Sequence, residues 1–371
     1  MADARLRARE RAWQQCPDDP EAVAGLIAAR RRAGLEVPGW LLDQQVHPGR
    51  AFEPGAPFEV FADLPEGGIR HLGATTRATG LAVPPHHAWW VQPPGAGRAL
   101  PDVLALVREH RVPGLALPRA QLTARDLAAA GELPGLTWLS LAGCGRLDAE
   151  ALSVLAERAP GLRHLELDRC GRGLRVRQDA LRGLPDLIHL FLRDRAGDAD
   201  VAEVVAGAPK LTRLRIGGRQ LTNEGVERLA ALSDLTRLEV GFAGRVSARG
   251  IEALAALPRL LHLDLVACAR AKGPSLGKLA RLQHLISLGY YPVGRWGLLR
   301  GADATDLRGL ARLTRLEHLA LLDLATRASP ALTAAERSRL EAALPECQVT
   351  YVASLDTRLL GPVSPEGPPA G

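Results

Sequence analysis

The sequence has few aromatic residues and almost no lysine, and it lacks the patterns that mark secreted or membrane-spanning proteins. Aromatic residues make up 4% of the 371 residues, and only Lys210, Lys272 and Lys278 are lysines among 47 basic residues. No stretch approaches the roughly 18 uninterrupted apolar residues of a membrane-spanning helix. The first residues, MADARLRARERAW, contain no apolar run typical of a signal peptide. We therefore expect a cytoplasmic protein that binds no membrane.

Cysteine is also scarce. The five cysteines are an odd number, they are widely spread, and no two of them form a Cys-x-x-Cys pair. This argues against a disulfide framework and against a zinc knuckle, so we expect reduced thiols. The net charge of +6 is carried almost entirely by arginine, but the arginines are scattered among acidic residues rather than clustered. We therefore expect no nucleic-acid partner.

A nine-residue frame recurs throughout the second two-thirds of the chain. Each copy reads apolar-x-x-Leu-x-apolar, and consecutive copies start 24 to 31 residues apart. The nine copies are VPGLALPRA from 112, LTWLSLAGC from 136, LRHLELDRC from 162, LIHLFLRDR from 187, LTRLRIGGR from 211, LTRLEVGFA from 235, LLHLDLVAC from 260, LISLGYYPV from 285 and LEHLALLDL from 316.

This frame resembles the leucine-rich repeat family, whose pattern L-x-x-L-x-L-x-x-Asn/Cys it matches across about 112–352. The cysteine-containing variant is nearest, the ribonuclease-inhibitor type is also similar, and we expect a bacterial protein. The resemblance implies an α/β fold: a solenoid, or horseshoe, with a parallel sheet on the concave side and helices on the convex side. Stacking is needed because one strand–helix unit cannot bury its apolar face alone.

The segments between copies have the spacing of helices. Four of them, starting near residues 122, 147, 221 and 246, have apolar residues three or four apart. Each helical run is preceded by a residue whose side-chain oxygen can cap exposed helical N–H groups. These predicted caps are Thr123, Asp148, Thr222 and Ser247.

Three cysteines occupy the ninth position of their copies, where the family has Asn or Cys. For Cys144, Cys170 and Cys268 the resemblance implies burial and a hydrogen bond to the backbone of the neighbouring coil. This ladder is imperfect, because the other copies have different residues at this position. They carry Ala120, Arg195, Arg219, Ala243, Val293 and Leu324.

The residues outside the array differ in pattern. Residues 1–48 contain two amphipathic runs joined by PDDP, which predict a helical hairpin resembling a single tetratricopeptide-like unit. Residues 49–111 contain short β-like runs and a helix at PDVLALVREH, and we expect them to form an N-terminal cap on the array. Residues 112–352 form the array, and 353–371 form a Pro/Gly-rich tail expected to be disordered.

No residue cluster indicates catalysis, a metal or a cofactor. The adjacent His86 and His87 would face opposite sides of a strand, which makes them a poor chelating pair. His164, Glu166 and His189 would lie together on an open sheet, which is a poor cage for a metal. We therefore expect neither cofactor nor metal and no enzymatic activity; the alternative, an enzyme, would need a site in residues 49–111, the segment whose pattern is least explained.

The frame aligns its third and fifth positions into two columns on the outward side of the sheet. In addition, the longest spacing carries GYYPVGRWGLLRG, an insertion that we expect to form a loop on the binding face or a loop folded over its own coil. The predicted partner-binding residues are Trp138, His164, Glu166, His189, Phe191, Arg213, Arg215, Arg237, Glu239, His262 and Asp264 in the columns, and Tyr290, Tyr291 and Trp296 in the insertion.

Together these patterns predict a non-catalytic, monomeric module that binds a protein partner on the concave face. Trp and Arg, both present in the columns, are enriched among binding hot spots. The alternatives are a regulator or inhibitor that caps a partner enzyme, and a structural scaffold. In a scaffold the column residues would simply be solvated strand residues.

Overall fold

The computed structural model describes residues 26–27, 29–30, 35, 37, 50–63, 69–83, 89–94, 100–171, 173–193, 196–268, 273–282, 284–292, 302–323 and 331–352. They fall into two compact units, one that ends at Leu117 and one that begins at Pro118. The predicted tail, almost all of the predicted hairpin, and the residues His86, His87 and Trp296 lie outside the described residues. No helix in the described part of the chain is long and apolar enough to cross a membrane.

The first unit contains the short strands and the helix predicted for residues 49–111. Strand β2 pairs in antiparallel fashion with β3 and β5, β1 pairs with β4, and β5 pairs in parallel with β6. Phe52 packs against Phe58 and Trp89 at ring-centroid distances of 6.0 and 5.4 Å, which gives this unit an aromatic core. The elements are β1 (Arg50–Phe52), β2 (Glu59–Asp63), β3 (Ile69–Ala74), β4 (Leu81–Val83), β5 (Trp89–Gln92), α4 (Leu100–Glu109) and β6 (Gly114–Ala116).

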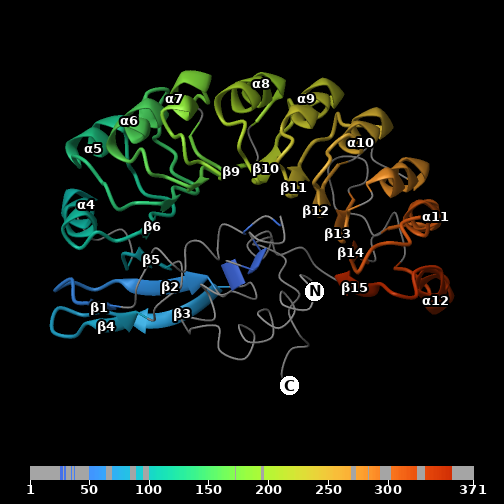
Figure 1. Ribbon diagram of the computed structural model, residues 1–371, viewed down its shortest axis with the longest axis horizontal. Helices are drawn as coiled ribbons and strands as arrows, with labels where there is room; N and C mark the ends of the chain where they lie inside the picture. Colours follow the sequence, from blue (N-terminus) through green and yellow to red (C-terminus); the bar gives the residue numbers. More distant parts are fainter. Residues whose placement is uncertain are drawn as a thin grey trace. The chain divides into compact units, whose positions relative to one another are not determined.

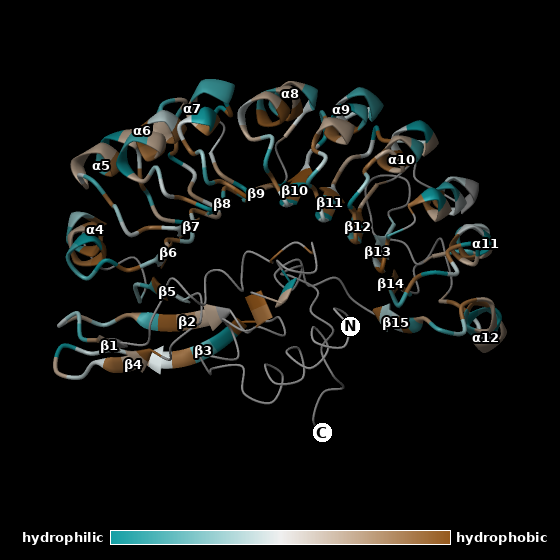
Figure 2. Ribbon diagram, in the orientation of Figure 1, coloured by the Kyte–Doolittle hydropathy of each residue, from teal (hydrophilic) through white to brown (hydrophobic). Residues whose placement is uncertain are grey.

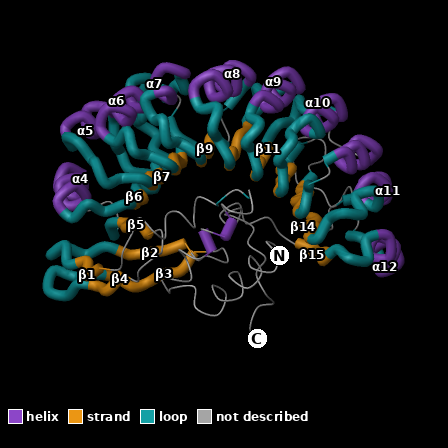
Figure 3. The backbone as a smooth tube through the Cα atoms, viewed as in Figure 1, coloured by secondary structure: helices purple, strands orange, loops and turns teal. Residues whose placement is uncertain are grey.

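The second unit alternates parallel strands with helices, and Figures 1 and 3 show the strands in one layer and the helices in the other. The strands are β7 (Trp138–Ser140), β8 (His164–Glu166), β9 (His189–Leu192), β10 (Arg213–Gly217), β11 (Arg237–Gly241), β12 (His262–Val266), β13 (Ser287–Tyr291), β14 (His318–Leu322) and β15 (Gln348–Val352). The helices are α5 (Ala124–Ala129), α6 (Ala151–Arg158), α7 (Gln178–Arg182), α8 (Asp198–Gly207), α9 (Asn223–Arg228), the 3-10 helix η2 (Leu229–Ala231), α10 (Ala248–Leu254), the 3-10 helix η3 (Gly273–Arg281), α11 (Ala304–Leu310) and α12 (Ala334–Ala343).

The repeat frame sets the register of these strands. Leu165 pairs with Leu190, and Leu190 in turn pairs with Leu214, so fourth-position leucines stack from coil to coil. These side chains are at most 2% exposed. Figure 2 shows that the helices of this unit are more hydrophilic on the side that faces away from the strands. The second unit is therefore a solenoid of leucine-rich repeats, as the frame predicts.

The ninth-position cysteines are buried and bonded to the preceding coil, which confirms their predicted structural role. The Cys170 Sγ donates to the Leu141 carbonyl at 3.2 Å, and the Cys268 Sγ donates to the Val240 carbonyl at 3.4 Å. Burial raises the pKa of Cys144 to about 11 and that of Cys268 to about 12. Thiols of this kind stay protonated and unreactive at neutral pH.

The predicted helix caps are only partly confirmed. Thr222 accepts the Glu224 N–H at 3.2 Å, as an N-cap does. Ser247 stands at the N-cap position, but its hydroxyl accepts a bond from Asn223 of the preceding coil instead. Asp148 is not the N-cap of α6, which is Glu150, but its carboxylate accepts the Glu150 N–H at 3.2 Å in the turn before the helix. Inter-coil bonds and turns thus compete with local capping.

A pair of glycines provides a test of the close stacking between coils. Gly217 and Gly241 pair at the ends of β10 and β11. A Cβ at Gly217 would lie 1.7 Å from the Gly241 carbonyl oxygen, whereas a Cβ at Gly241 would meet only side-chain atoms, at 3.4 Å or more. We expect Gly217→Ala to lower the free energy of unfolding by about 2 kcal/mol or more, because the backbone must shift.

The matched control is Gly241→Ala, which we expect to change the free energy of unfolding by less than about 1 kcal/mol. Guanidinium-induced unfolding followed by circular dichroism measures both variants. Equal destabilisation of the two would show that the β10–β11 contact does not depend on glycine.

Candidate partner-binding surface

The strand register brings the predicted column residues together on one face of the second unit, which we call the strand face. His164 pairs with His189, Arg213 with Arg237, and Arg237 with His262, so the third-position column is continuous. The fifth-position column is aligned in the same way. It contains Ser140, Glu166, Phe191, Arg215, Glu239 and Asp264.

Four rings at the β7–β9 end of the strand face form an aromatic cluster of Trp138, His164, His189 and Phe191. The His164 ring stacks on Trp138 at 5.0 Å and meets Phe191 edge-on at 4.8 Å. The Nδ1 atoms of His164 and His189 are 3.3 Å apart and share a hydrogen bond. All four side chains are half-buried. The cluster therefore holds its rings in fixed orientations while leaving part of each ring accessible.

Beside this cluster, two arginines and two carboxylates form a buried ion ring of Asp168, Arg193, Arg215 and Glu239. Arg193 lies 3.3 Å from both carboxylates. Arg215 approaches Asp168 to 3.2 Å and Glu239 to 2.8 Å, so each arginine bridges both acids. The four side chains are only 4–9% exposed. Charges so deeply buried are tolerated only when they are paired in this way.

The ion ring is tied to the aromatic cluster and to further carboxylates. The Arg215 guanidinium lies 4.3 Å from the centre of the Phe191 ring, a cation–π contact. Ser140 donates to Glu166 at 2.7 Å, and Arg237 lies 4.0 Å from Asp264. Although burial opposes it, the neighbouring carboxylates, Glu239 first, raise the pKa of Arg215, which therefore stays charged.

Two members of the ion ring, Asp168 and Arg193, are absent from the predicted binding residues. Both occupy the seventh position of the frame, which lies two residues beyond the fifth and faces the same side of the sheet. The sequence contained one signal that could have identified them, namely that both residues are charged at a position that is uncharged in the other copies. Other copies have Pro118, Ala142, Gly217, Gly241, Val266, Tyr291 or Leu322 at this position, and none of these is ionisable at neutral pH.

The prediction that Tyr290 and Tyr291 lie on an exposed loop is wrong. Both residues belong to strand β13, and they are 0% and 3% exposed. Tyr290 takes the sixth, core position of the frame, and its hydroxyl bonds the buried Asp306 at 3.1 Å. Tyr291 takes the seventh position, so the repeat frame continues through the sequence that was interpreted as an insertion.

Three histidines of the strand face, His164, His189 and His262, have lowered pKa values and are neutral at pH 7. Burial, followed by Arg213 and Arg215, lowers the pKa of His164 to about 3. Burial and Arg237 lower the pKa of His262 to about 4. The pKa of His189 is also well below its usual value, through burial and then Arg213. The arginines of the third-position column thus set a positive potential along that column.

A metal ion at His164 and His189 would lie close to the two arginines that depress the pKa of His164. Within the described ranges, no group of three or more His, Cys, Asp or Glu residues is arranged to hold a metal ion.

Removing one member of the ion ring should be costly. Arg215→Ala would leave Asp168 and Glu239 buried with one arginine between them, and we expect a loss of about 3–5 kcal/mol in the free energy of unfolding. The control is Arg249→Ala, which breaks an Arg–Glu pair on a side chain that is 73% exposed and should change stability little. Urea unfolding measures both, and a similar small effect for the two would show that the ring is not a stabilising unit.

The histidines should make stability depend on pH. Their pKa values are lower in the folded protein than the unfolded value of about 6.5. At these positions the unfolded chain binds more protons below pH 6.5, so the histidine contribution to the free energy of unfolding should fall as the pH drops from 7 to 5. Glu239 acts in the opposite direction, because burial raises its pKa to about 7.

We expect His262→Gln to remove the share of this fall that His262 contributes. Denaturant titrations at pH 7, 6 and 5 measure the slopes. An identical slope for wild type and His262→Gln would contradict the assignment.

The comparisons with known proteins concern the fold alone. No protein-family model matches the sequence, and no curated protein matches it significantly. An internalin structure from Listeria monocytogenes is 19% identical with a TM-score of 0.43, over 68% of this chain and 71% of that chain. The chain in a TLR13–ssRNA13 complex is 15% identical with a TM-score of 0.42, over 70% of this chain and 35% of that chain.

The leucine-rich-repeat ectodomain of the Arabidopsis receptor kinase HAESA, in complex with a peptide hormone ligand, is 14% identical with a TM-score of 0.30. That match covers 58% of this chain and 37% of the other, so this chain spans only about a third of the HAESA and TLR13 chains. None of these likenesses assigns a ligand to this chain, and the repeat architecture is established by the frame and the strand register themselves.

Proposed function

We propose that this protein is a non-catalytic interaction module that binds a protein partner on the strand face of its repeat unit. The aromatic cluster is the observation that carries the proposal. Trp138 and Phe191 are large, half-buried rings that offer apolar area to a partner, and Trp is among the residues most enriched in binding hot spots. They lie next to arginines of the columns, and arginine is also enriched in binding hot spots.

The surface is held in place before any partner arrives. Trp138, His164 and Phe191 fix one another by ring contacts, and the cation–π contact joins Phe191 to Arg215 of the ion ring. Side chains that are already immobilised lose less conformational entropy on binding. A face built in this way favours one partner geometry, as a specific binding surface requires.

Charge on the strand face gives selectivity. Arg213 and Arg237 are neighbours in the third-position column, and the histidines beside them are neutral. The fifth-position carboxylates Glu166 and Asp264 flank them at a deeper level, with side chains 22% and 11% exposed. Complementary charges on a partner would orient it along the columns and would increase the association rate.

Two alternatives differ in what they require of the strand face. A regulator or inhibitor would use this face to cover the active site of a partner enzyme, so the activity of a captured partner identifies it. In a structural scaffold the column residues are only solvated strand residues, so no partner should depend on them.

The test compares wild type with the triple variant Trp138→Ala, Arg213→Ala, Arg237→Ala in affinity capture from the native host. We expect the triple variant to lose the specific partner, with affinity reduced by roughly a hundredfold or more, because hot-spot truncations each cost about 2 kcal/mol. Isothermal titration with the purified partner then measures the affinity directly.

The control is Arg228→Ala, Arg249→Ala, Arg259→Ala, three exposed arginines paired to acids outside the strand face. This variant should retain the partner, and circular dichroism must show that both variants remain folded. Equal capture by wild type and both triple variants would contradict binding on the strand face.

A further inference from the structure

Three arginines lie in the loops that follow the strands of the first three copies of the frame. Arg119, Arg146 and Arg169 are all exposed to solvent. Within the described ranges, Arg119 and Arg146 form no ion pair. None of the three loops contains an acidic residue. They consist of residues 118–121, 143–146 and 169–171, and we call the surface that they form the loop edge.

The stacking of coils brings together arginines that are a full repeat apart in sequence. The Arg119 N–H donates to the Ala142 carbonyl, and the Gly143 N–H donates to the Asp168 carbonyl, both at 2.7 Å. A Cβ at Gly143 would lie 3.0 Å from the Arg119 Cγ, so the Arg119 stem runs beside the second loop. Neighbouring strands lie about 4.8 Å apart, so the first and third loops are about 10 Å apart. About three residues of an extended peptide cover that distance.

Acidic side chains of these coils are already engaged within the fold. Asp168, the residue before the third loop, is 3% exposed and belongs to the ion ring. Asp126 accepts hydrogen bonds from Thr123 at the start of α5, and these bonds, followed by the charge of Arg146, lower the pKa of its carboxyl. Asp148 accepts a backbone N–H before α6. The exposed charge of the three loops is therefore positive.

Two of the three arginines have a backbone conformation that favours glycine. Arg119 and Arg169 have φ values of 59° and 58°, and Gly143 in the coil between them has 76°. An L side chain costs free energy in this left-handed region, whereas glycine does not. The coil imposes the conformation, since Phe242 and Ala267 at the eighth position of later copies have it as well. Glycine would therefore serve the fold at both places, and strain of this kind is often found at functional sites.

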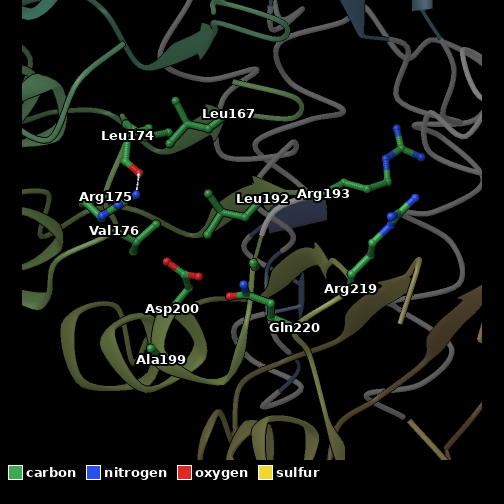
Figure 4. Close-up of a pocket in the computed structure, with 11 residues that line it drawn as sticks. Leu167, Leu174, Arg175, Val176, Leu192, Arg193, Ala199, Asp200, Arg219 and Gln220 are labelled. Atoms are coloured by element: carbon green, nitrogen blue, oxygen red, sulfur yellow. Dashed lines mark hydrogen bonds between the residues drawn. The ribbon is translucent and has the colours of Figure 1, made fainter. Parts of the chain in front are cut away.

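An arginine that follows a strand also turns outward in a later coil. Arg219 occupies the ninth position of the fifth copy and is exposed. Figure 4 shows its guanidinium group directed away from Leu174 and Val176, which line the neighbouring cavity. The apolar core leaves such side chains on the outside, where a ligand can reach them.

We propose that the loop edge binds an acidic segment of a protein, in which aspartate or glutamate residues recur over a few residues of extended chain. The guanidinium groups of Arg119, Arg146 and Arg169 donate charge-assisted hydrogen bonds to the carboxylates of this segment. The loop edge is a second interaction surface, separate from the aromatic cluster and the arginine column of the strand face.

A nucleic acid is the other polyanion that arginines bind, and the loop edge suits it less well. The three loops contain no aromatic residue, so successive bases would have no ring on which to stack. Three arginines are also few beside the roughly six to ten phosphate contacts that a strong nucleic-acid binder makes. We therefore keep the expectation that this protein binds no nucleic acid.

The experiment uses the full-length protein and fluorescein-labelled decaglutamate, with binding measured by fluorescence anisotropy at low ionic strength. The test variant replaces the three arginines of the loop edge by glutamate, as Arg119→Glu, Arg146→Glu, Arg169→Glu. We expect its affinity for decaglutamate to be at least about tenfold lower than that of the wild type, because each attractive charge becomes a repulsive one. Unchanged affinity would show that the peptide binds elsewhere, and would contradict the proposal.

The control variant makes the same change in net charge on the helices of the unit. It is Arg182→Glu, Arg281→Glu, Arg339→Glu, three exposed arginines in α7, η3 and α12. Its affinity should change less than about twofold, because salt screens exposed charges that lie far from the ligand. An equal loss of affinity in both variants would show that only the net charge of the protein matters, and would rule out a site on the loop edge.

A second variant separates binding from stability. Arg119→Gly, Arg169→Gly removes two positive charges and relieves the left-handed strain, so the thermal midpoint should be unchanged or higher. Its affinity for decaglutamate should nevertheless fall about threefold or more. If the affinity does not fall, the two arginines are not part of a binding surface.

Two further measurements identify the ligand class and the surface. We expect a labelled oligothymidylate of the same length to bind more weakly than decaglutamate; tighter binding that the triple glutamate variant abolishes would assign the loop edge to nucleic acid instead. Trp138→Ala, which truncates the aromatic cluster of the strand face, should leave decaglutamate binding unchanged, so the two proposals can fail separately. A wild-type protein that binds no decaglutamate would overturn the proposal outright.

Discussion

Stacking of the leucine positions from one coil to the next is the constraint on which the rest of the repeat unit depends. The leucine at the fourth position of each copy fixes the register between parallel strands. A shift by one residue would turn the core side chains to solvent. Once the register is fixed, the cross-strand neighbours of the residues between the leucines are fixed as well. His164 must lie beside His189, and Arg213 beside Arg237, whatever their charges. The core therefore decides which surface groups meet.

The ion ring shows what this enforced proximity makes possible. Arg215 and Asp168 are 47 residues apart in sequence, yet 3.2 Å separate their charged atoms because they belong to coils two repeats apart. Arg193 reaches the acid on β11 by passing Gly241, where a Cβ would be in ordinary contact with the arginine stem, 3.5 Å away. Of the two paired seventh-position glycines, only Gly217 is therefore required, by the close stacking of strands.

The repeat pattern was sufficient to predict the fold, the strand register and the structural role of the cysteines. It failed where a residue's environment depends on several coils at once. Arg215 and Glu239 were correctly placed on the strand face, but their burial could not be predicted, because it follows from Asp168 and Arg193 on other coils. Tyr290 was misplaced because an irregular spacing suggested a loop, while the frame that assigns it to the core continued unbroken.

The ninth position of the repeat has different structural effects, depending on the residue that occupies it. A small residue such as Cys170 fills the space between coils and bonds a backbone carbonyl, so it stabilises the stack. Arginine at the same place is too long and too strongly hydrated to be buried without a partner, and it turns outward. Arg219 is exposed in this way. Because neighbouring coils supply the core, such an exchange is tolerated, and the strands beside it keep the register of the repeat although the consensus residue is lost.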